Sequence, residues 1–191
     1  MPSAQVKTCA VFFIGQEIHL DYLVSSSGVP VLIPEKYNFD AIQIHTMSKR
    51  KFLKDADPKA FNTMMAFERY LAESSLSKTH AELIKIRVSQ INGCSYCIDK
   101  HIKDALNAGE SGQRLYLLPV WRDTVFFTKE EQAILALAEE MTLIANKGVS
   151  DDVYNNALNL LGQQCLTEVM MAIIAMNSWN RIGITTERKP E

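Results

Sequence analysis

Cysteine, net charge and long apolar runs are all scarce in this sequence, and each shortage narrows what the protein can be. With only four cysteines among 191 residues and no clear export signal, structural disulfides are not expected. The net charge of −2 and the pI near 6.1 give no basic surface that would attract nucleic acid. No apolar run in the sequence approaches the roughly 20 residues that span a bilayer. We therefore expect neither a nucleic-acid partner nor a membrane partner.

Residues 1–46 differ in composition from the rest of the chain. They carry the whole net charge of −2, because two lysines oppose four acidic residues there and the remainder is balanced. The stretches 9–14 and 29–34 are short apolar runs with β character, bounded by glycine and proline. Lys7 precedes the first run, but that run has only the minimum length of a secretion signal and no convincing cleavage pattern follows. We therefore predict a cytoplasmic protein with an N-terminal extension that is partly β or irregular.

Residues 47–191 have the pattern of one all-α domain with about seven helices. A chain of this length with 47% hydrophobic residues can bury a full core. Apolar residues recur at helical spacing from Met47 onward, and the last helix is apolar on almost all sides, so we expect it to be buried. Capping residues, glycine and proline mark the ends of the predicted helices. The first helix begins at Pro58, the second runs from Ser77 or Thr79 to Asn92, the third from Cys94 to Gly109, and a short fourth from Leu115 to Leu118, ended by Pro119. The fifth begins at the capping box Thr128/Glu131 and ends near Gly148, the sixth runs from Ser150 to Gly162, and the last from Leu166 to about Arg181.

The most informative stretch runs from Cys94 to Cys97, with His101 four residues beyond, because it combines two thiols with a proton acceptor. On a helix that begins near Cys94, these three side chains project from about the same face. Asn92 and Gly93 predict a turn just before this helix, so both thiols fall in its first turn, where free N–H groups and the helix dipole favour an anionic sulfur. Such positions lower a thiol pKa by roughly one to several units from about 8.5. We expect partial thiolate at neutral pH and a redox site.

Other interpretations of these residues stay open. A zinc site made by the two thiols, the histidine and Glu82 is chemically possible, but structural zinc sites usually have a second ligand pair, and the other two cysteines are isolated. Covalent haem attachment requires histidine directly after the second cysteine, where Ile98 stands. Taken alone, Glu82 with Lys85 at i+3 is more typical of a solvated surface pair than of a catalytic group. Tyr96 is by default a packing aromatic.

The segment from Glu82 to Cys97, with the following His101, resembles the alkyl hydroperoxidase D-like (AhpD-like) core of the carboxymuconolactone decarboxylase superfamily. The pattern Glu-x11-Cys-x2-Cys-x3-His is highly specific. Segments 117–122 and 175–181 are also similar to single-domain members, so the resemblance covers residues 47–181 and leaves out residues 1–46. It implies an all-α fold that forms homo-oligomers, which we expect to be trimers or hexamers.

The resemblance also implies thiol-dependent reduction of organic hydroperoxides or hydrogen peroxide, with no cofactor. Cys97 matches the peroxidatic thiol and Cys94 the more accessible resolving thiol, while Glu82 and His101 match a proton relay that ionises Cys97. This relay replaces the surface interpretation of Glu82. Attack on peroxide gives a sulfenic acid, and the second thiol condenses with it to a disulfide. A dithiol, thioredoxin-like or lipoyl-type partner must then reduce the disulfide. Tyr96 stands where an additional histidine can occur in peroxidase members.

Two other classes of function stay open. Decarboxylases of the superfamily generally lack the cysteine pair, which argues against that activity, whereas a non-enzymatic redox sensor or partner-binding module would keep the pair. Trp121, Arg122, Trp179 and Asn180 are candidates for lining the thiol pocket or a subunit interface, although aromatics on apolar helices more often belong to the core. Cys165 precedes the predicted buried helix and is expected to behave as a small hydrophobic residue.

Overall fold

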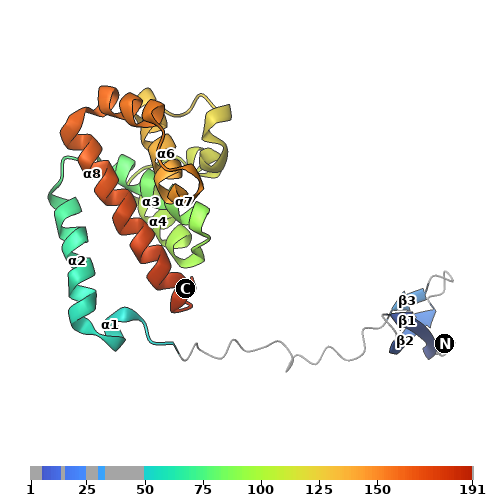
Figure 1. Cartoon of the computed structure of the whole chain (residues 1–191). Coiled ribbons are helices and arrows are strands. Elements are labelled where there is room, and N and C mark those ends of the chain that lie inside the picture. The colour runs from blue at the N-terminus through green and yellow to red at the C-terminus, as the bar shows by residue number, and fades with distance from the viewer. Residues whose placement is uncertain (1–5, 14–15, 25–29, 33–49, 191) are drawn as a thin grey trace. The chain divides into compact units, whose positions relative to one another are not determined.

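The computed structural model describes the backbone of residues 6–13, 16–24 and 30–32, and the backbone and side chains of residues 50–190. Its backbone contacts divide the chain into two compact units, Met1–Met47 and Ser48–Glu191. The described part of the first unit is made of strands, and that of the second is helical (Figure 1).

The first unit contains a three-stranded antiparallel sheet in the order β1-β2-β3. Its strands are β1 (Val6–Phe13), β2 (Gln16–Val24) and β3 (Pro30–Leu32). The pairing of β1 with β2 runs from Val6 opposite Leu23 to Phe13 opposite Gln16. The apolar runs 9–14 and 29–34 overlap β1 and β3, as their β character predicts. Strand β2 was not predicted, although polar and apolar residues alternate through it with the period of a strand.

The second unit confirms the predicted all-α domain. Most of the predicted helices are present, and a short additional helix precedes Pro58. The helices are α1 (Leu53–Ala56), α2 (Pro58–Glu73), α3 (Lys78–Asn92), α4 (Ser95–Asn107), α5 (Gly112–Leu117), the 3₁₀ helix η2 (Leu118–Asp123), α6 (Lys129–Thr142), α7 (Ile144–Lys147) and α8 (Asp151–Thr185).

Helix α3 is the central element of the core, because it buries side chains on two sides. Ile84 and Val88 belong to an apolar cluster shared with α6 and α8. Leu83 and Ile86 belong to a second cluster, shared with α4, α5, η2 and α6. All four side chains are at most 1% exposed. Full burial of such a side chain stabilises the fold by about 1.5–3 kcal/mol, so α3 is held firmly in position.

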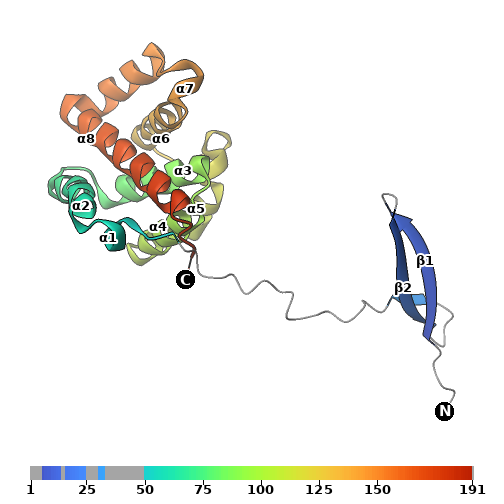
Figure 2. The ribbon, with the colours of Figure 1, turned by 60° about the horizontal axis from the view of Figure 1, so that its bottom comes forward.

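Helix α8 crosses the helical unit in front of α3 and α4 in the view of Figure 1, and Figure 2 shows it between α2 and α6. Gly162 has φ +73° and ψ 165°, which interrupts the helix, so the predicted stop at this glycine is confirmed. By length and a mean hydropathy of 1.3, α8 could cross a membrane. Its residues Leu166, Val169 and Ile173 are nevertheless fully buried in the first apolar cluster, as expected of a core helix.

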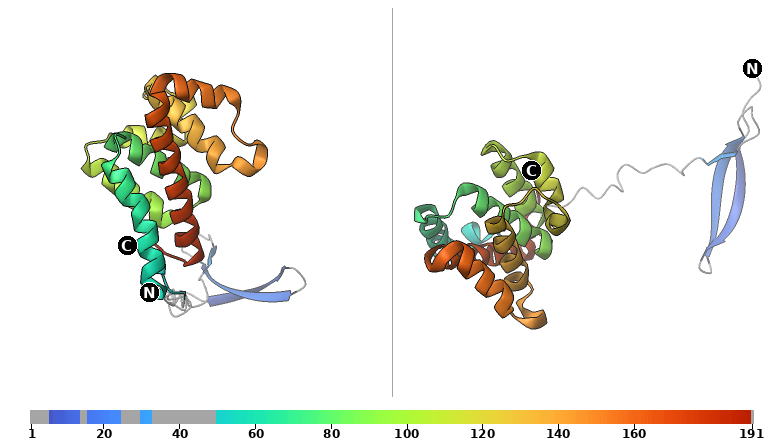
Figure 3. Two further views of the ribbon diagram at one scale, coloured as in Figure 1. Left: turned by 60° about the vertical axis from the view of Figure 1, so that its left-hand side comes forward. Right: turned by 90° about the horizontal axis from the view of Figure 1, so that it is seen from above.

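Helix α2 lies beside the C-terminal half of α8 (Figure 3). The Trp179 Nε1–H donates a hydrogen bond to Glu68 Oε1 at 2.8 Å, and the ring of Phe61 meets the indole edge-on at 6.0 Å. No side chain of α2 is fully buried. The helix is therefore attached along one side only, and an open pocket lies next to it.

One predicted helix end is confirmed and another is wrong. Helix α5 begins at Gly112 rather than Leu115 but ends at Leu117, just before Pro119, and the separate 3₁₀ helix η2 follows with the proline in its first turn, where no N–H is needed. The helix after the capping box ends at Thr142 rather than near Gly148, and the separate turn α7 follows it. The capping box itself is confirmed, with Thr128 and Glu131 bonding each other's backbone N–H groups.

Candidate active site

The turn between α3 and α4 determines where the cysteines lie. Ser77 caps the beginning of α3, accepting a hydrogen bond from the His80 N–H. Gly93 ends that helix at φ +72° and ψ 31°, a left-handed conformation that favours glycine. Cys94 is then the N-cap of α4, and Cys97 lies in its first turn. The predicted position of both sulfurs at a helix N-terminus is therefore confirmed.

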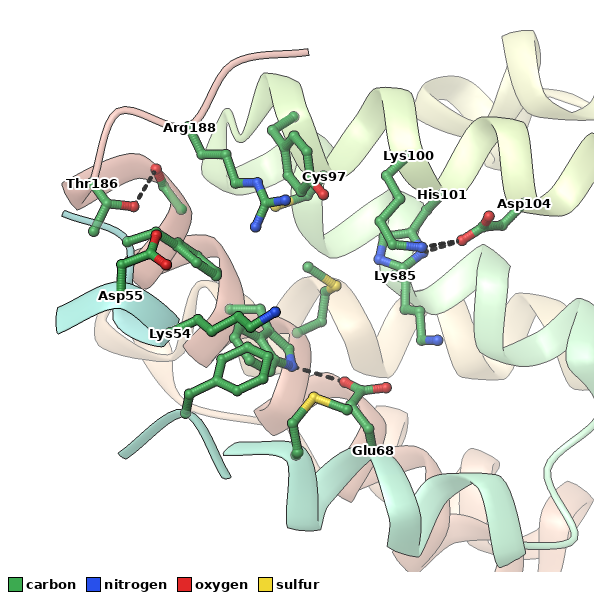
Figure 4. A pocket seen from close by; sticks show the side chains of 17 residues that line it. Lys54, Asp55, Glu68, Lys85, Cys97, Lys100, His101, Asp104, Thr186 and Arg188 are labelled. Atoms are coloured by element: carbon green, nitrogen blue, oxygen red, sulfur yellow. Dashed lines mark hydrogen bonds and ion pairs between the residues drawn. The ribbon is translucent and has the colours of Figure 1, made fainter. Parts of the chain in front are cut away.

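Cys94 and Cys97 are joined by a disulfide in this structure, with their Cα atoms 5.3 Å apart. This is the oxidised state of the pair. The Cys94 side chain is 2% exposed and the Cys97 side chain 5%. Only Cys97 lines the large pocket of the helical unit (Figure 4). The expectation that Cys94 is the more accessible thiol is therefore wrong for the oxidised chain, because α8 covers that sulfur.

Gly183 of α8 lies directly against the disulfide. A Cβ atom added at this residue would be 3.4 Å from Cys94 Sγ and 3.7 Å from Cys97 Sγ. Glycine therefore allows the backbone of α8 to approach both sulfurs. No local pattern in the sequence identifies this contact, since Gly183 is more than 80 residues from the cysteines.

Glu82 and His101 form a buried pair between α3 and α4. His101 Nδ1 lies 2.8 Å from Glu82 Oε2, and the two residues are 9% and 7% exposed. Lys85 Nζ lies 3.3 Å from the other carboxylate oxygen. The interpretation of Glu82 as a solvated surface residue is therefore wrong, because α4 packs over this side of α3. Lys85 is its partner as that interpretation assumed, but the lysine side chain is only 18% exposed.

Opposing effects act on the Glu82 carboxyl group. Burial by itself raises its pKa, because it disfavours the charged form. The hydrogen bond with His101 and the positive charge of Lys85 outweigh burial, so the pKa of Glu82 lies below its usual value. Glu82 is thus an ionised carboxylate at neutral pH. It orients the imidazole by accepting a hydrogen bond from Nδ1–H, and this leaves Nε2 as the basic nitrogen.

The pocket has a volume of about 720 Å³. Cys97 and His101 lie on its wall, and so do aromatic, methionine and charged side chains from α1, α2, α3 and α8 (Figure 4). Its other lining residues are Phe52, Lys54, Asp55, Phe61, Met65, Glu68, Lys85, Tyr96, Lys100, Asp104, Met176, Trp179, Gly183, Thr186 and Arg188. The arrangement exposes a sulfur and an imidazole to a bound molecule in mainly apolar surroundings.

Of the weaker candidates, only Trp179 lines this pocket. Trp121 and Arg122 instead donate hydrogen bonds to Glu139 of α6. Asn180 is fully buried, and its side chain bonds Asn92 and Ser89 of α3, which fixes the end of α3 against α8. None of these three residues lines the pocket.

Cys165 is a half-buried free thiol, and burial together with the charge of Glu168 raises its pKa. Cys9, His19 and His45 fall where the structure describes no side chains. His80 is in the first turn of α3, away from the pocket.

A metal site is a further possibility for these side chains. Ligand atoms of Glu82, His101 and Asp104 lie within 4.8 Å of one another. Both carboxylates already form ion pairs, Glu82 with Lys85 and Asp104 with Lys100 at 2.5 Å. Both sulfurs are joined in the disulfide. In this oxidised state they cannot act as thiolate ligands of the Cys-Cys-His-Glu zinc site that the sequence left as an alternative.

Known proteins resemble the chain in both sequence and structure. A sequence model of the carboxymuconolactone decarboxylase family matches residues 58–140. The chain is 42% identical over 138 residues to the uncharacterised protein YdfG of Bacillus subtilis (strain 168), which covers 72% of this chain and 94% of that protein. It is also 42% identical over 60 residues to alkyl hydroperoxide reductase AhpD of Beijerinckia indica subsp. indica. That match covers 30% of this chain and 33% of that protein.

A solved structure also matches. A protein of unknown function from Agrobacterium tumefaciens, described as a candidate antioxidant defence protein AhpD, superposes with a TM-score of 0.72 at 34% identity. The match covers 74% of this chain and 97% of that one. The shared helical fold and sequence identify the chain as an AhpD-like member of the carboxymuconolactone decarboxylase superfamily.

Proposed function

We propose that the protein is a thiol peroxidase that reduces organic hydroperoxides or hydrogen peroxide, with Cys97 as the attacking thiol and Cys94 as the resolving thiol. The observation that carries this proposal is the buried hydrogen bond between Glu82 and His101, one helical turn from a cysteine on the wall of the same pocket. A base oriented by a carboxylate beside a nucleophile is the arrangement that activates nucleophiles in enzymes.

The first step is ionisation of the reduced Cys97 thiol. With its Nδ1–H donated to Glu82, His101 accepts the thiol proton at Nε2, and the carboxylate stabilises the imidazolium that forms. The free N–H groups at the start of α4 stabilise the thiolate.

The thiolate then attacks the terminal oxygen of the hydroperoxide. A sulfur–oxygen bond forms as the oxygen–oxygen bond breaks, and the leaving alkoxide takes the proton held by His101, giving an alcohol and a Cys97 sulfenic acid. The Cys94 thiol attacks that sulfur, releasing water and forming the disulfide seen here. Sulfur is oxidised and peroxide reduced by two electrons.

A dithiol must return the pair to the reduced state. We propose a small dithiol, a thioredoxin-like protein or a lipoyl-type group as the reductant, attacking Cys97 Sγ through the pocket, because Cys94 is covered by α8. A homo-oligomer, trimeric or hexameric, and a cytoplasmic location belong to the same proposal. Light scattering tests the assembly, and a mass equal to that of the monomer at micromolar concentration contradicts it.

Hydroperoxide consumption measured with several dithiol reductants tests the activity. We expect turnover with at least one dithiol, loss of turnover in Cys97→Ser, and unchanged turnover in Cys165→Ser. A redox sensor would behave differently: it would form the disulfide once and consume no further peroxide under any reductant. That result contradicts the peroxidase proposal.

A further inference from the structure

The pocket is far larger than hydrogen peroxide requires. Its volume is about 720 Å³, whereas a water molecule takes up roughly 30 Å³ of liquid volume and hydrogen peroxide has only twice as many heavy atoms. Pockets of roughly 300–1,000 Å³ are typical of sites that enclose organic molecules. The size therefore favours an extended organic hydroperoxide.

The aromatic and methionine residues of the pocket suit an apolar chain. Phe61 and Trp179 meet edge-on at 6.0 Å, Phe52 stacks edge-on against Phe61 at 6.2 Å, and Met65 and Met176 line the same pocket. The indole nitrogen of Trp179 already donates to Glu68, so it presents no unpaired polar group to a ligand. An alkyl chain lying along this aromatic wall would lose water contact on most of its surface.

The charged residues of the pocket are not all neutralised. Lys85 pairs with Glu82, and Lys100 pairs with Asp104. Within residues 50–190, neither Arg188 nor Lys54 has a carboxylate at ion-pair distance. Of the acidic lining residues, Asp55 and Glu68 also form no ion pair within that range, and Glu68 accepts a hydrogen bond from the neutral indole of Trp179.

Arg188 is held in a fixed position by two aromatic rings. Its guanidinium carbon lies 4.0 Å from the ring centroid of Tyr96 and 4.4 Å from that of Phe52. Its backbone N–H also bonds the carbonyl oxygen of Gly183. The guanidinium group points into the pocket from the same side as Cys97 (Figure 4). The side chain of Lys54 extends into the same pocket from α1. A stacked guanidinium keeps its N–H edge free, and that edge matches the two oxygens of a carboxylate.

From these contacts we propose that the pocket selects hydroperoxides of long-chain carboxylic acids, with the carboxylate on Arg188, the chain along the aromatic wall and the hydroperoxide at Cys97. This rests on the proposed peroxidase function. Arg188 is then a specificity-determining residue, and Tyr96, which stands between the two cysteines, is the platform that positions it.

Ligand binding tests the proposal without any turnover. The probes are ω-hydroxydecanoate and its methyl ester, which differ in charge and not in chain, titrated calorimetrically into the oxidised protein. A charge-assisted hydrogen bond corresponds to about a ten- to hundredfold change in affinity. We expect the acid to bind at least tenfold more tightly than the ester. That preference should vanish in Arg188→Gln and persist in Lys189→Gln, an exposed neighbour outside the pocket with the same charge change. Equal binding of the two probes, or a preference that persists in Arg188→Gln, overturns the proposal.

Kinetics separates this proposal from the peroxidase proposal. The acid hydroperoxide should have a kcat/KM roughly ten- to hundredfold above that of its methyl ester. In Arg188→Gln the acid should fall to the value of the ester, whereas Lys189→Gln, outside the pocket, should keep the preference for the acid and consume tert-butyl hydroperoxide at the parent rate. Absence of turnover with every hydroperoxide, combined with the binding preference, overturns the peroxidase function and retains the carboxylate site. Turnover without preference for the acid retains the peroxidase function and overturns the carboxylate site.

Discussion

His101 Nδ1 and Glu82 Oε2 are 2.8 Å apart, although the two residues are separated by 19 positions and lie on different helices. Both are buried, and the pocket that contains the Cys97 sulfur also contains the imidazole. A carboxylate excluded from water is costly unless it is paired, and here His101 and Lys85 pair it. The relationship links the stability of the α3–α4 contact to the reactivity of the thiol.

Glu82→Gln should separate these two contributions. Loss of the carboxylate removes the group that stabilises the imidazolium, so the pH at which reduced Cys97 reacts with iodoacetamide should move upward. Peroxidase turnover should fall by roughly 10²-fold or more. The free energy of unfolding should fall by about 1–3 kcal/mol, because Lys85 loses its partner. Stopped-flow alkylation across pH and urea denaturation measure the two effects.

Glu73→Gln is the matched control, since Glu73 is an exposed glutamate at the end of α2. It should change neither quantity. If Glu82→Gln alkylates like the parent at every pH while His101→Gln does not, the carboxylate has no part in the relay. The double variant should lose less than the sum of the single losses, because both groups serve one proton path.

Mild peroxide should convert the reduced protein to the Cys94–Cys97 disulfide and leave Cys165 reduced. The pKa of Cys165 is raised by burial and by Glu168, so little thiolate is present there at neutral pH. In Cys94→Ser, the Cys97 sulfenic acid should accumulate and react with dimedone. Peptide mass spectrometry measures both. Recovery of parent Cys97 mainly as sulfinic acid, with Cys94 untouched, would remove Cys94 from the resolving role.

Gly183→Ala should slow reduction of the disulfide without weakening the fold. The new methyl group would lie 3.4 Å from Cys94 Sγ and 3.7 Å from Cys97 Sγ, in ordinary contact and between the sulfurs and α8. Alanine in a helix interior is favoured over glycine by up to about 1 kcal/mol, so thermal stability should hold or rise. Reduction by dithiothreitol, followed by thiol titration, should be several-fold slower.

Gly112→Ala is the corresponding control, because its added Cβ would meet only Tyr116, at 3.7 Å. It should leave the reduction rate unchanged. An equal rate in Gly183→Ala and the parent would mean that α8 does not limit access to the sulfurs.

Glu139 should contribute to stability in a pH-dependent way. Burial alone raises its pKa, but hydrogen bonds from Arg122, Trp121 and Arg87 lower it below the usual value. The ionised carboxylate therefore stabilises the fold above the unfolded-state pKa of about 4.3, and the effect is lost as pH falls through the lower folded-state pKa. Glu139→Gln should cost about 1–3 kcal/mol at pH 7 and progressively less below about pH 4. Urea denaturation across this range checks it, with exposed Glu130→Gln as a control that should match the parent.

The sequence by itself determined the local features of the domain. Ser77, Gly93, Thr128 and Gly162 act on neighbours a few residues away, so their capping and breaking roles are readable from the chain alone. The same holds for the two cysteines in the first turn of α4, since helix geometry relates residues three and four apart. The pairing of Glu82 with His101 was predicted from the resemblance to a known family. Sequence spacing could not predict it, because the two residues lie on different helices.

Only the tertiary structure decided which faces of the helices are covered. Local patterning makes Glu82 a surface residue, and it is buried because α4 packs over it. The same packing puts Gly183 against the disulfide and Arg188 on Tyr96, contacts that join residues about 90 positions apart. Helical periodicity indicates which residues share a face of a helix. Which other segment packs on that face depends on the tertiary fold. For this reason the reactive motif could be identified from the sequence, whereas the pocket and the covering of its sulfurs could not.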